Sequence, residues 1–282
     1  MHFLIHTFFH TLKDTWLMFP LLFLTYFLLE SYSHSHKGED HIFTSLQKYG
    51  PVFGALLGLI PQCGFSVLAA MLFVQKHITI GTLLAMFIAT SDEAIPMLLS
   101  MPDLHTHLIV LLALKLTIGI VVGLLVDNVI FKNQTLLPFK EDEDLEIAHV
   151  HCSCSEHKGS ILHNVLHHTL KIFGLVFVTA FLFSLIIHAI GHEALSTLLL
   201  TDSVFQPILA SFFGLIPNCS ASVVLCQLFA LDQLSFGSLL AGLITNAGLG
   251  LFVLFEMHAG RKNIFRILTI LLATAMICGV LL

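Results

Sequence analysis

Apolar residues come in long runs that short polar connectors separate, and the lengths of these runs predict helices that cross a membrane. Two further apolar stretches, 51–75 and 203–230, are each interrupted near the middle. The pattern predicts an all-α integral membrane protein with a first transmembrane repeat over 1–131, a linker over 132–167 and a second repeat over 168–282. The uninterrupted runs cover 14–30, 78–100, 106–131, 168–190, 235–257 and 262–282.

The two interruptions carry the same phrase, which indicates an internal duplication. Gly58-Leu-Ile-Pro-Gln-Cys-Gly-Phe-Ser66 returns 156 positions later as Gly214-Leu-Ile-Pro-Asn-Cys-Ser-Ala-Ser222. The similarity continues outward at the same offset, for example from Pro51 to Pro207 and from Gly81 to Gly237. The repeated phrase is therefore the centre of each repeat.

Each interrupted stretch is expected to form a broken, re-entrant helical hairpin. Its two arms have about ten and twelve residues, whereas a spanning helix needs roughly twenty. Pro61 lacks an N–H group and Gly64 tolerates unusual dihedral angles, so the backbone can break there if the break lines a polar cavity. A single kinked helix is the alternative.

Three full spans per half are an odd number, so the second repeat should be inverted relative to the first, giving five plus five helices. The loop cations test this topology, because they concentrate on the cytoplasmic side of membrane proteins. If both termini lie on the outer side of the cell (inner) membrane and the linker lies in the cytoplasm, every loop cation except Lys13 is on the cytoplasmic side. The cations that agree are Lys37, Lys48, Lys76, Lys132, Lys140, Lys158, Lys171, Arg261, Lys262 and Arg266.

Composition supports the membrane assignment and excludes other classes. Apolar residues make up 56% of the chain and charged residues 11%, so the lipid bilayer is a partner. The net charge of −6 argues against nucleic acid. Four of the six cysteines fall inside apolar runs, which favours free thiols over disulfides. The chain has no nucleotide-binding glycine loop, so transport would use an ion gradient or a partner. No resident cofactor is expected.

Charged residues inside the predicted hairpin of 78–100 and 106–131 are candidates for ion coupling. Asp92 and Glu93 lie in one helix and Lys115 in the other, and ionisable groups in hydrocarbon are costly unless paired or hydrated. Asp92 and Lys115 are both about 12 to 15 Å from the turn at 1.5 Å per residue, so an ion pair is possible. Alternatively, they only hold the hairpin together. Gly248 and Leu249 replace the two carboxylates in the second half.

The linker carries a His- and Cys-rich segment that could capture a metal ion. Imidazoles and thiols at a spacing of one to three residues suit Zn²⁺ or a softer ion, although the spacing is not that of a zinc finger. An ordinary solvated linker is the alternative. The candidate metal ligands are His149, His151, Cys152, Cys154 and His157.

The two breaks provide a candidate substrate site near the middle of the membrane. Thiols, amides, hydroxyls and backbone carbonyls at two chain breaks suit a metal or metalloid. The alternative is that the cysteines pack as small hydrophobic residues. The candidate substrate-binding residues are Gln62, Cys63, Ser66, Thr90, Asn218, Cys219, Ser222 and Asn246.

The paired Ile-Pro-x-Cys-x-x-Ser phrases, the segment Thr90-Ser-Asp-Glu-Ala-Ile-Pro96 and the His-rich linker resemble the ten-helix heavy-metal exporters related to arsenic permeases. Some members of that family are described as manganese transporters. The resemblance implies an efflux permease for a heavy metal or divalent cation. A divalent cation would compete with Lys115 and with protons for the carboxylates of Asp92 and Glu93, which predicts exchange of metal for protons. Arsenic permeases carry a denser Cys-x-Cys-Gly cluster, whereas Gly64 follows Cys63 here, so an arsenical substrate is the second choice.

Two functional classes other than a transporter are an intramembrane hydrolase and a metal sensor. An intramembrane hydrolase is disfavoured, because Ser196 stands where the zinc motif begun by His192-Glu193 needs a second histidine, and Val67 follows Ser66 where a hydrolase elbow needs glycine. A metal-sensing membrane protein that transports nothing stays open. The sequence leaves the transported ion, the direction of transport and the oligomeric state open.

Overall fold

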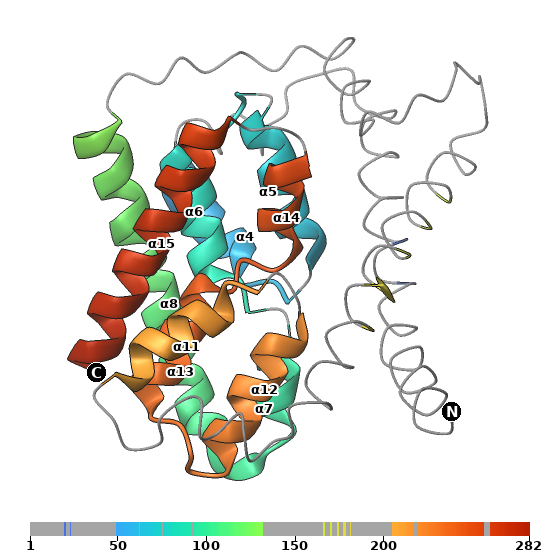
Figure 1. Cartoon of the computed structure of the whole chain (residues 1–282), viewed down its shortest axis with the longest axis vertical. Helices are drawn as coiled ribbons and strands as arrows, with labels where there is room; N and C mark the ends of the chain where they lie inside the picture. Colours follow the sequence, from blue (N-terminus) through green and yellow to red (C-terminus); the bar gives the residue numbers. More distant parts are fainter. Residues whose placement is uncertain are drawn as a thin grey trace.

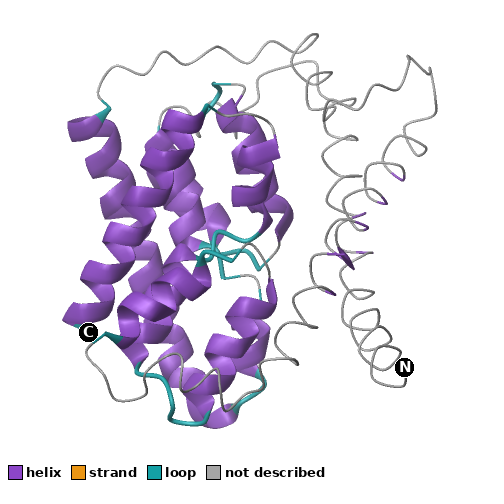
Figure 2. Ribbon diagram, viewed as in Figure 1, coloured by secondary structure: helices purple, strands orange, loops and turns teal. Residues whose placement is uncertain are grey.

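The computed structural model describes residues 49–61, 63–74, 76–91, 93–131, 205–216, 219–256 and 260–282, together with Pro20, Phe23 and six separate positions between 166 and 181. Over these residues the secondary structure is helical and contains no strand (Figure 2). The expectation of an all-α protein is therefore confirmed for this part of the chain. The predicted helices 14–30 and 168–190 and the linker fall almost entirely outside it.

From residue 49 onward, the described part of the first half contains four short helices and one long helix. α4 covers Gly50–Gly58, α5 Cys63–Val74, α6 Ile80–Ala89, α7 Ala94–Leu99 and α8 His105–Leu125. A 3₁₀ turn, Pro102–Leu104, leads into α8, and a π-helical turn, Val126–Ile130, follows it.

The second half repeats this order. α11 covers Gln206–Gly214, α12 Cys219–Ala230, α13 Phe236–Thr245, α14 Leu249–Glu256 and α15 Arg261–Leu281. Each of these helices begins 156 positions after its counterpart in the first half, except α14, whose start at Leu249 is one position earlier than that offset predicts. The duplication seen in the sequence therefore extends to the helix boundaries.

Matching residues begin the matching helices. Pro51 and Pro207 stand in the first turn of α4 and α11, where the missing N–H costs nothing and the fixed φ suits a helix. Thr79 and Ser235 cap α6 and α13, and their hydroxyls accept from the backbone N–H of Thr82 and Ser238.

The predicted break of 51–75 is confirmed, since α4 ends at Gly58 and α5 begins at Cys63. A second break corrects a prediction. The runs 78–100 and 235–257 were each expected to be one continuous helix, but α6 ends at Ala89 before α7 begins, and α13 ends at Thr245 before α14. The physical reason is that Thr90 and Asn246 leave the helical conformation, with ψ of 129° and 78°.

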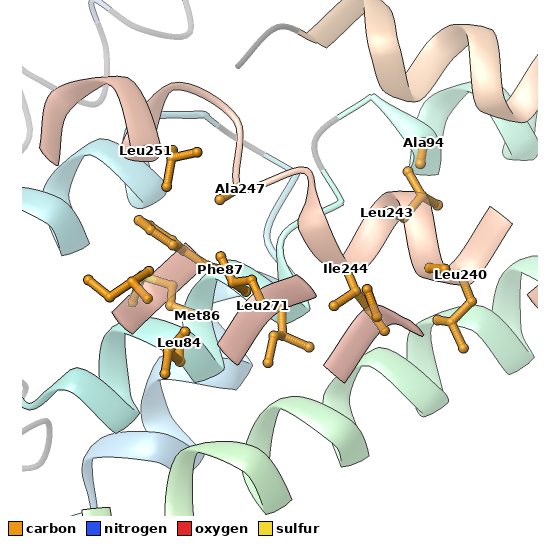
Figure 3. Close-up of a cluster of buried hydrophobic side chains, with 14 of the residues drawn as sticks. Leu84, Met86, Phe87, Ala94, Leu240, Leu243, Ile244, Ala247, Leu251 and Leu271 are labelled. Atoms are coloured by element: carbon orange, nitrogen blue, oxygen red, sulfur yellow. The ribbon is translucent and has the colours of Figure 1, made fainter. Parts of the chain in front are cut away.

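Short helices of one half pack against short helices of the other half. α5 packs against α14 at one end of the bundle, and α12 packs against α7 at the other (Figure 1). α4, α6 and α8 pack on one another within the first half, as α11, α13 and α15 do within the second. The two repeats therefore form one bundle around one core. Figure 3 shows part of this core, with Leu84, Met86 and Phe87 of α6 and Leu240, Leu243 and Ile244 of α13 in one cluster.

Glycines let the helices of each half approach closely. A Cβ atom on Gly58 would lie 2.5 Å from the carbonyl oxygen of Met86, and one on Gly214 would lie 2.0 Å from that of Gly242. These two glycines occupy the same place in their repeats, so α4 meets α6 as α11 meets α13, nearly backbone to backbone. Small residues at helix contacts are typical of proteins in membranes.

Within the described residues, four segments are long and apolar enough to cross a membrane: Ile80–Leu99, Pro102–Ile130, Phe236–Phe255 and Arg261–Leu281. The first and third contain the breaks described above. The long helices α8 and α15 leave large apolar side chains on the outside, among them Ile109, which is 68% exposed, and Phe265, which is 71% exposed. Lys115 of α8 is fully buried. Apolar residues outside and a charge inside are what a helical bundle in lipid requires.

Candidate substrate site

The interruptions of the helices gather near the middle of the bundle, where Figure 2 shows several loop segments between the helical ends. Four of the predicted substrate-binding residues are polar and buried in the bundle: Ser66, Thr90, Ser222 and Asn246. Backbone that leaves the helix at membrane depth must be satisfied by protein or water. These breaks are therefore where a polar path through the bundle could lie.

Thr90 and Asn246 are equivalent residues that end equivalent helices. Each is the C-cap, with its backbone N–H still bonded to the last turn, to Met86 in α6 and to Gly242 in α13. The Thr90 hydroxyl donates back to the Met86 carbonyl oxygen at 2.8 Å. The Asn246 side-chain oxygen accepts from the N–H of Gly248 at 3.3 Å. The amide side chain thus stabilises the chain as it leaves α13.

Lys115 joins the two breaks. Its ammonium group donates to the carbonyl oxygen of Thr90, and also to that of Leu243 in the last turn of α13 at 2.9 Å. The first bond was not expected, and the second crosses from the first repeat to the second. The predicted partner of Lys115, Asp92, lies outside the described residues, so that ion pair stays a prediction.

Ser66 lies against the other half. A Cβ atom on Gly250 of α14 would be 2.5 Å from the Ser66 carbonyl oxygen and 2.7 Å from the nearest atom of the Phe87 ring. Gly250 comes two residues after Gly248, whose φ of +56° falls in the left-handed region that favours glycine. Gly248 and Gly250 thus turn the chain after the break at Asn246 and bring α14 against α5 and α6.

Glu93 is the N-cap residue of α7, directly after the break at Thr90, and is partly buried. Cys226 is fully buried in α12, which packs against α7. The repeat pattern does not single out Cys226, because its counterpart in the first repeat is Ala70. Only the packing of α12 against α7 places Cys226 beside a helix of the first half.

Several predicted residues lie outside the described part of the chain. They are Gln62, Asn218, Asp92 and the linker ligands His149, His151, Cys152, Cys154 and His157. The backbones of Cys63 and Cys219 are described and begin α5 and α12, but their side chains are not. Within the described residues, no group of three or more His, Cys, Asp or Glu side chains could hold a metal ion. A metal site there would also need hydroxyl, amide or carbonyl oxygens.

Comparison with known proteins decides the family. One family model matches residues 6–189 and 156–282, which together span nearly the whole chain, and it is described as "Putative, 10TM heavy-metal exporter". The chain belongs to this ten-helix exporter family. No curated protein and no solved structure matches it.

The family match confirms the resemblance seen in the paired phrases. Together with the apolar helices, it makes the protein a multi-pass membrane protein of a heavy-metal exporter family. In each half the described residues form five helices, two of which are the parts of one broken apolar run: α6 with α7, and α13 with α14. The family favours transport over catalysis.

Proposed function

We propose that the protein is a secondary exporter of a divalent heavy-metal ion of the manganese type, exchanged for protons across the inner membrane of the cell. One observation carries this proposal: the helices of both repeats break near the middle of one bundle, and Lys115 ties the two broken ends together. Broken helices at the interface of two repeats are where secondary transporters bind their substrates.

The ligands near the breaks suit a divalent cation. Hydroxyl and carboxylate oxygens, such as those of Thr90, Asp92 and Glu93, favour harder ions such as Mn²⁺, whereas the thiols of Cys63 and Cys219 favour softer ones. An entering cation would compete with protons for the carboxylates, so metal binding and proton release would be linked. This linkage is the proposed basis of proton exchange.

The proposed architecture is a pair of inverted repeats with the termini outside and the linker in the cytoplasm. It is supported by the matching helix boundaries and by the opposite directions of α8 and α15, whose chains run past each other in Figure 1. Inverted repeats allow one half to rock against the other around a fixed site, which gives alternating access.

Transport by purified protein in liposomes tests the proposal. We expect pH-dependent flux of Mn²⁺ that Asp92→Asn and Glu93→Gln reduce at least about tenfold, the scale of losing one or more metal-ligand interactions. Asp103→Asn is the matched control, because Asp103 is exposed in the turn before α8, and it should leave flux unchanged.

The same liposomes separate the alternatives. If the carboxylate variants keep full flux while Cys63→Ser/Cys219→Ser is inactive and arsenite or a methylated arsenical is carried, the substrate is a metalloid and the cation proposal is wrong. Cys278→Ser controls for loss of any thiol. If no metal or metalloid crosses the membrane, although the protein binds metal, a sensor takes the place of a carrier.

A further inference from the structure

The ammonium group of Lys115 lies between two helix ends that belong to different repeats. Two of its acceptors are backbone carbonyl oxygens, that of Thr90 at the end of α6 and that of Leu243 in the last turn of α13. Carbonyl groups at the C-terminus of a helix lack partners within the helix and carry partial negative charge. Two such ends facing one position make a place that attracts a cation.

The break in α13 frees the carbonyl of Leu243 for this purpose. In a continuous helix that oxygen would accept from the backbone N–H of Ala247, four residues later. Here the N–H of Ala247 bonds instead to the carbonyl oxygen of Thr245, at 2.9 Å. Lys115 thus supplies a donor where the break has removed one.

The matching position in the second repeat shows that packing does not require the charge. Leu271 follows Lys115 by 156 residues, lies in α15 as Lys115 lies in α8, and is also fully buried. Figure 3 shows Leu271 within the hydrophobic cluster beside the breaks. An apolar residue therefore fills this place in one half, whereas the other half holds an ammonium group whose burial costs free energy unless it is compensated.

We propose that the Thr90 and Leu243 carbonyl oxygens form a site for one monovalent cation, which the Lys115 ammonium group occupies as a tethered substitute. The two atoms assigned to this site are backbone carbonyl oxygens, one from each repeat. Its existence does not depend on which ion the protein exports.

Removing the side chain should open the site to a free cation. Lys115→Ala deletes the ammonium group and leaves room beside the two carbonyl groups. We expect its unfolding temperature in detergent to be several degrees below that of the wild type when the only monovalent cation is bulky N-methylglucamine. Na⁺, K⁺ or NH₄⁺ at the same ionic strength should raise it by about 3–6 °C in a saturable manner, as binding to the native state alone predicts.

Two comparisons make this result specific. The wild type should unfold within about 1 °C of the same temperature in all four chlorides, because its site is filled. Leu271→Ala, which truncates the matching buried side chain without removing a charge, should lose stability to a similar extent in every chloride.

Two results with Lys115→Ala would contradict the inference. If Lys115→Ala unfolds at one temperature in all monovalent chlorides, or is stabilised only by Mn²⁺, the inference is wrong. A variant that keeps a donor but loses the charge covers the case in which Lys115→Ala does not fold. If Lys115→Gln is as stable as the wild type, the site needs a hydrogen bond and not a cation. These measurements involve no transport, so they stand or fall separately from the proposed export.

Discussion

The carboxylate of Asp127 accepts a hydrogen bond from the hydroxyl of Thr79 at 2.6 Å, and so ties the end of α8 to the start of α6. Its other oxygen accepts from the backbone N–H of Gly81 at 2.9 Å. In the second repeat a different residue holds the start of α13. There Gln206 performs the task, and its side-chain oxygen accepts from the N–H of Ser235 at 3.0 Å. The two repeats thus anchor matching helix starts with different residues.

Asp127→Ala should lower the free energy of unfolding by about 1–2 kcal/mol, because Thr79 and Gly81 each lose a bond to a charged acceptor in a partly exposed place. Denaturant unfolding of the purified protein in detergent measures the change. Asn128→Ala is the control, since Asn128 is the exposed neighbour, and it should alter stability by less than about 0.5 kcal/mol. Equal effects of the two variants would contradict the role assigned to Asp127.

Gln206→Ala should cost more, about 2–3 kcal/mol, because it removes a buried side chain with three hydrogen bonds. These are the two accepted from the Ser235 N–H and the Ser238 hydroxyl and the one donated to the Gln233 carbonyl oxygen. Gln206→Glu keeps the accepting oxygens but turns a carboxylate toward that carbonyl group, so it should not restore stability. Thermal unfolding of both variants decides this, and a stable Gln206→Glu would show that the donated bond is unimportant.

The sequence predicted the break after α4 because proline and the repeated phrase mark it. It did not predict the breaks at Thr90 and Asn246, which fall inside apolar runs of full spanning length and carry no proline at the break itself. Their cause lies in the backbone, where Gly248 adopts a φ of +56° and Thr90 an extended ψ. Local composition does not distinguish such a break from a polar position in a continuous helix.

The sequence also did not predict the carbonyl acceptors of Lys115. Charge and depth in the hairpin pointed to a carboxylate nearby in the chain, whereas one of the acceptors found is the Leu243 carbonyl, 128 residues away. That contact depends on how α13 packs against α6 and α8 across the two repeats. A single sequence shows the duplication but not the packing of one copy against the other.

Gly250→Ala should destabilise the protein by about 1–3 kcal/mol, since the added Cβ would lie 2.5 Å from the Ser66 carbonyl oxygen and overpack the contact of α14 with α5. Ala94 occupies the matching position in α7 and is fully buried. The reverse change Ala94→Gly should therefore cost only about 1 kcal/mol, the usual price of glycine in a helix. Unfolding experiments on the two variants test whether close approach occurs at Gly250 alone.

Deleting residues 149–157 should remove metal binding by the linker without abolishing transport. The imidazoles and thiols there would capture metal and raise its local concentration, but the proposed transport site lies in the bundle. We expect the metal concentration for half-maximal flux to rise several-fold and the maximal rate to stay the same. Replacing the segment by an equally long Gly-Ser stretch controls for linker length. Complete loss of flux would show that the linker is part of the transport path.

The last prediction concerns the two thiols of the repeated phrase. Cys63 and Cys219 are the first residues of α5 and α12, directly after matching breaks, and we expect both to approach one substrate ion near the middle of the membrane. Two thiols can bind the same ion directly only if each sulfur lies roughly 2.3 Å from it. Phenylarsine oxide tests such a pair, because two thiols replace its oxygen, form two arsenic–sulfur bonds and release one water molecule.

A variant that keeps only these two thiols, with the other four replaced by serine or alanine, should bind one phenylarsine group per chain, as measured by intact mass. Removing either Cys63 or Cys219 from this variant should abolish stable binding, since a single arsenic–sulfur bond is displaced by added monothiol. A dithiol such as dimercaptopropanol should then release the group from the pair. If the variant with both thiols binds no more tightly than those with one, the two cysteines are too far apart to share an ion, and the site must be built from the oxygen ligands alone.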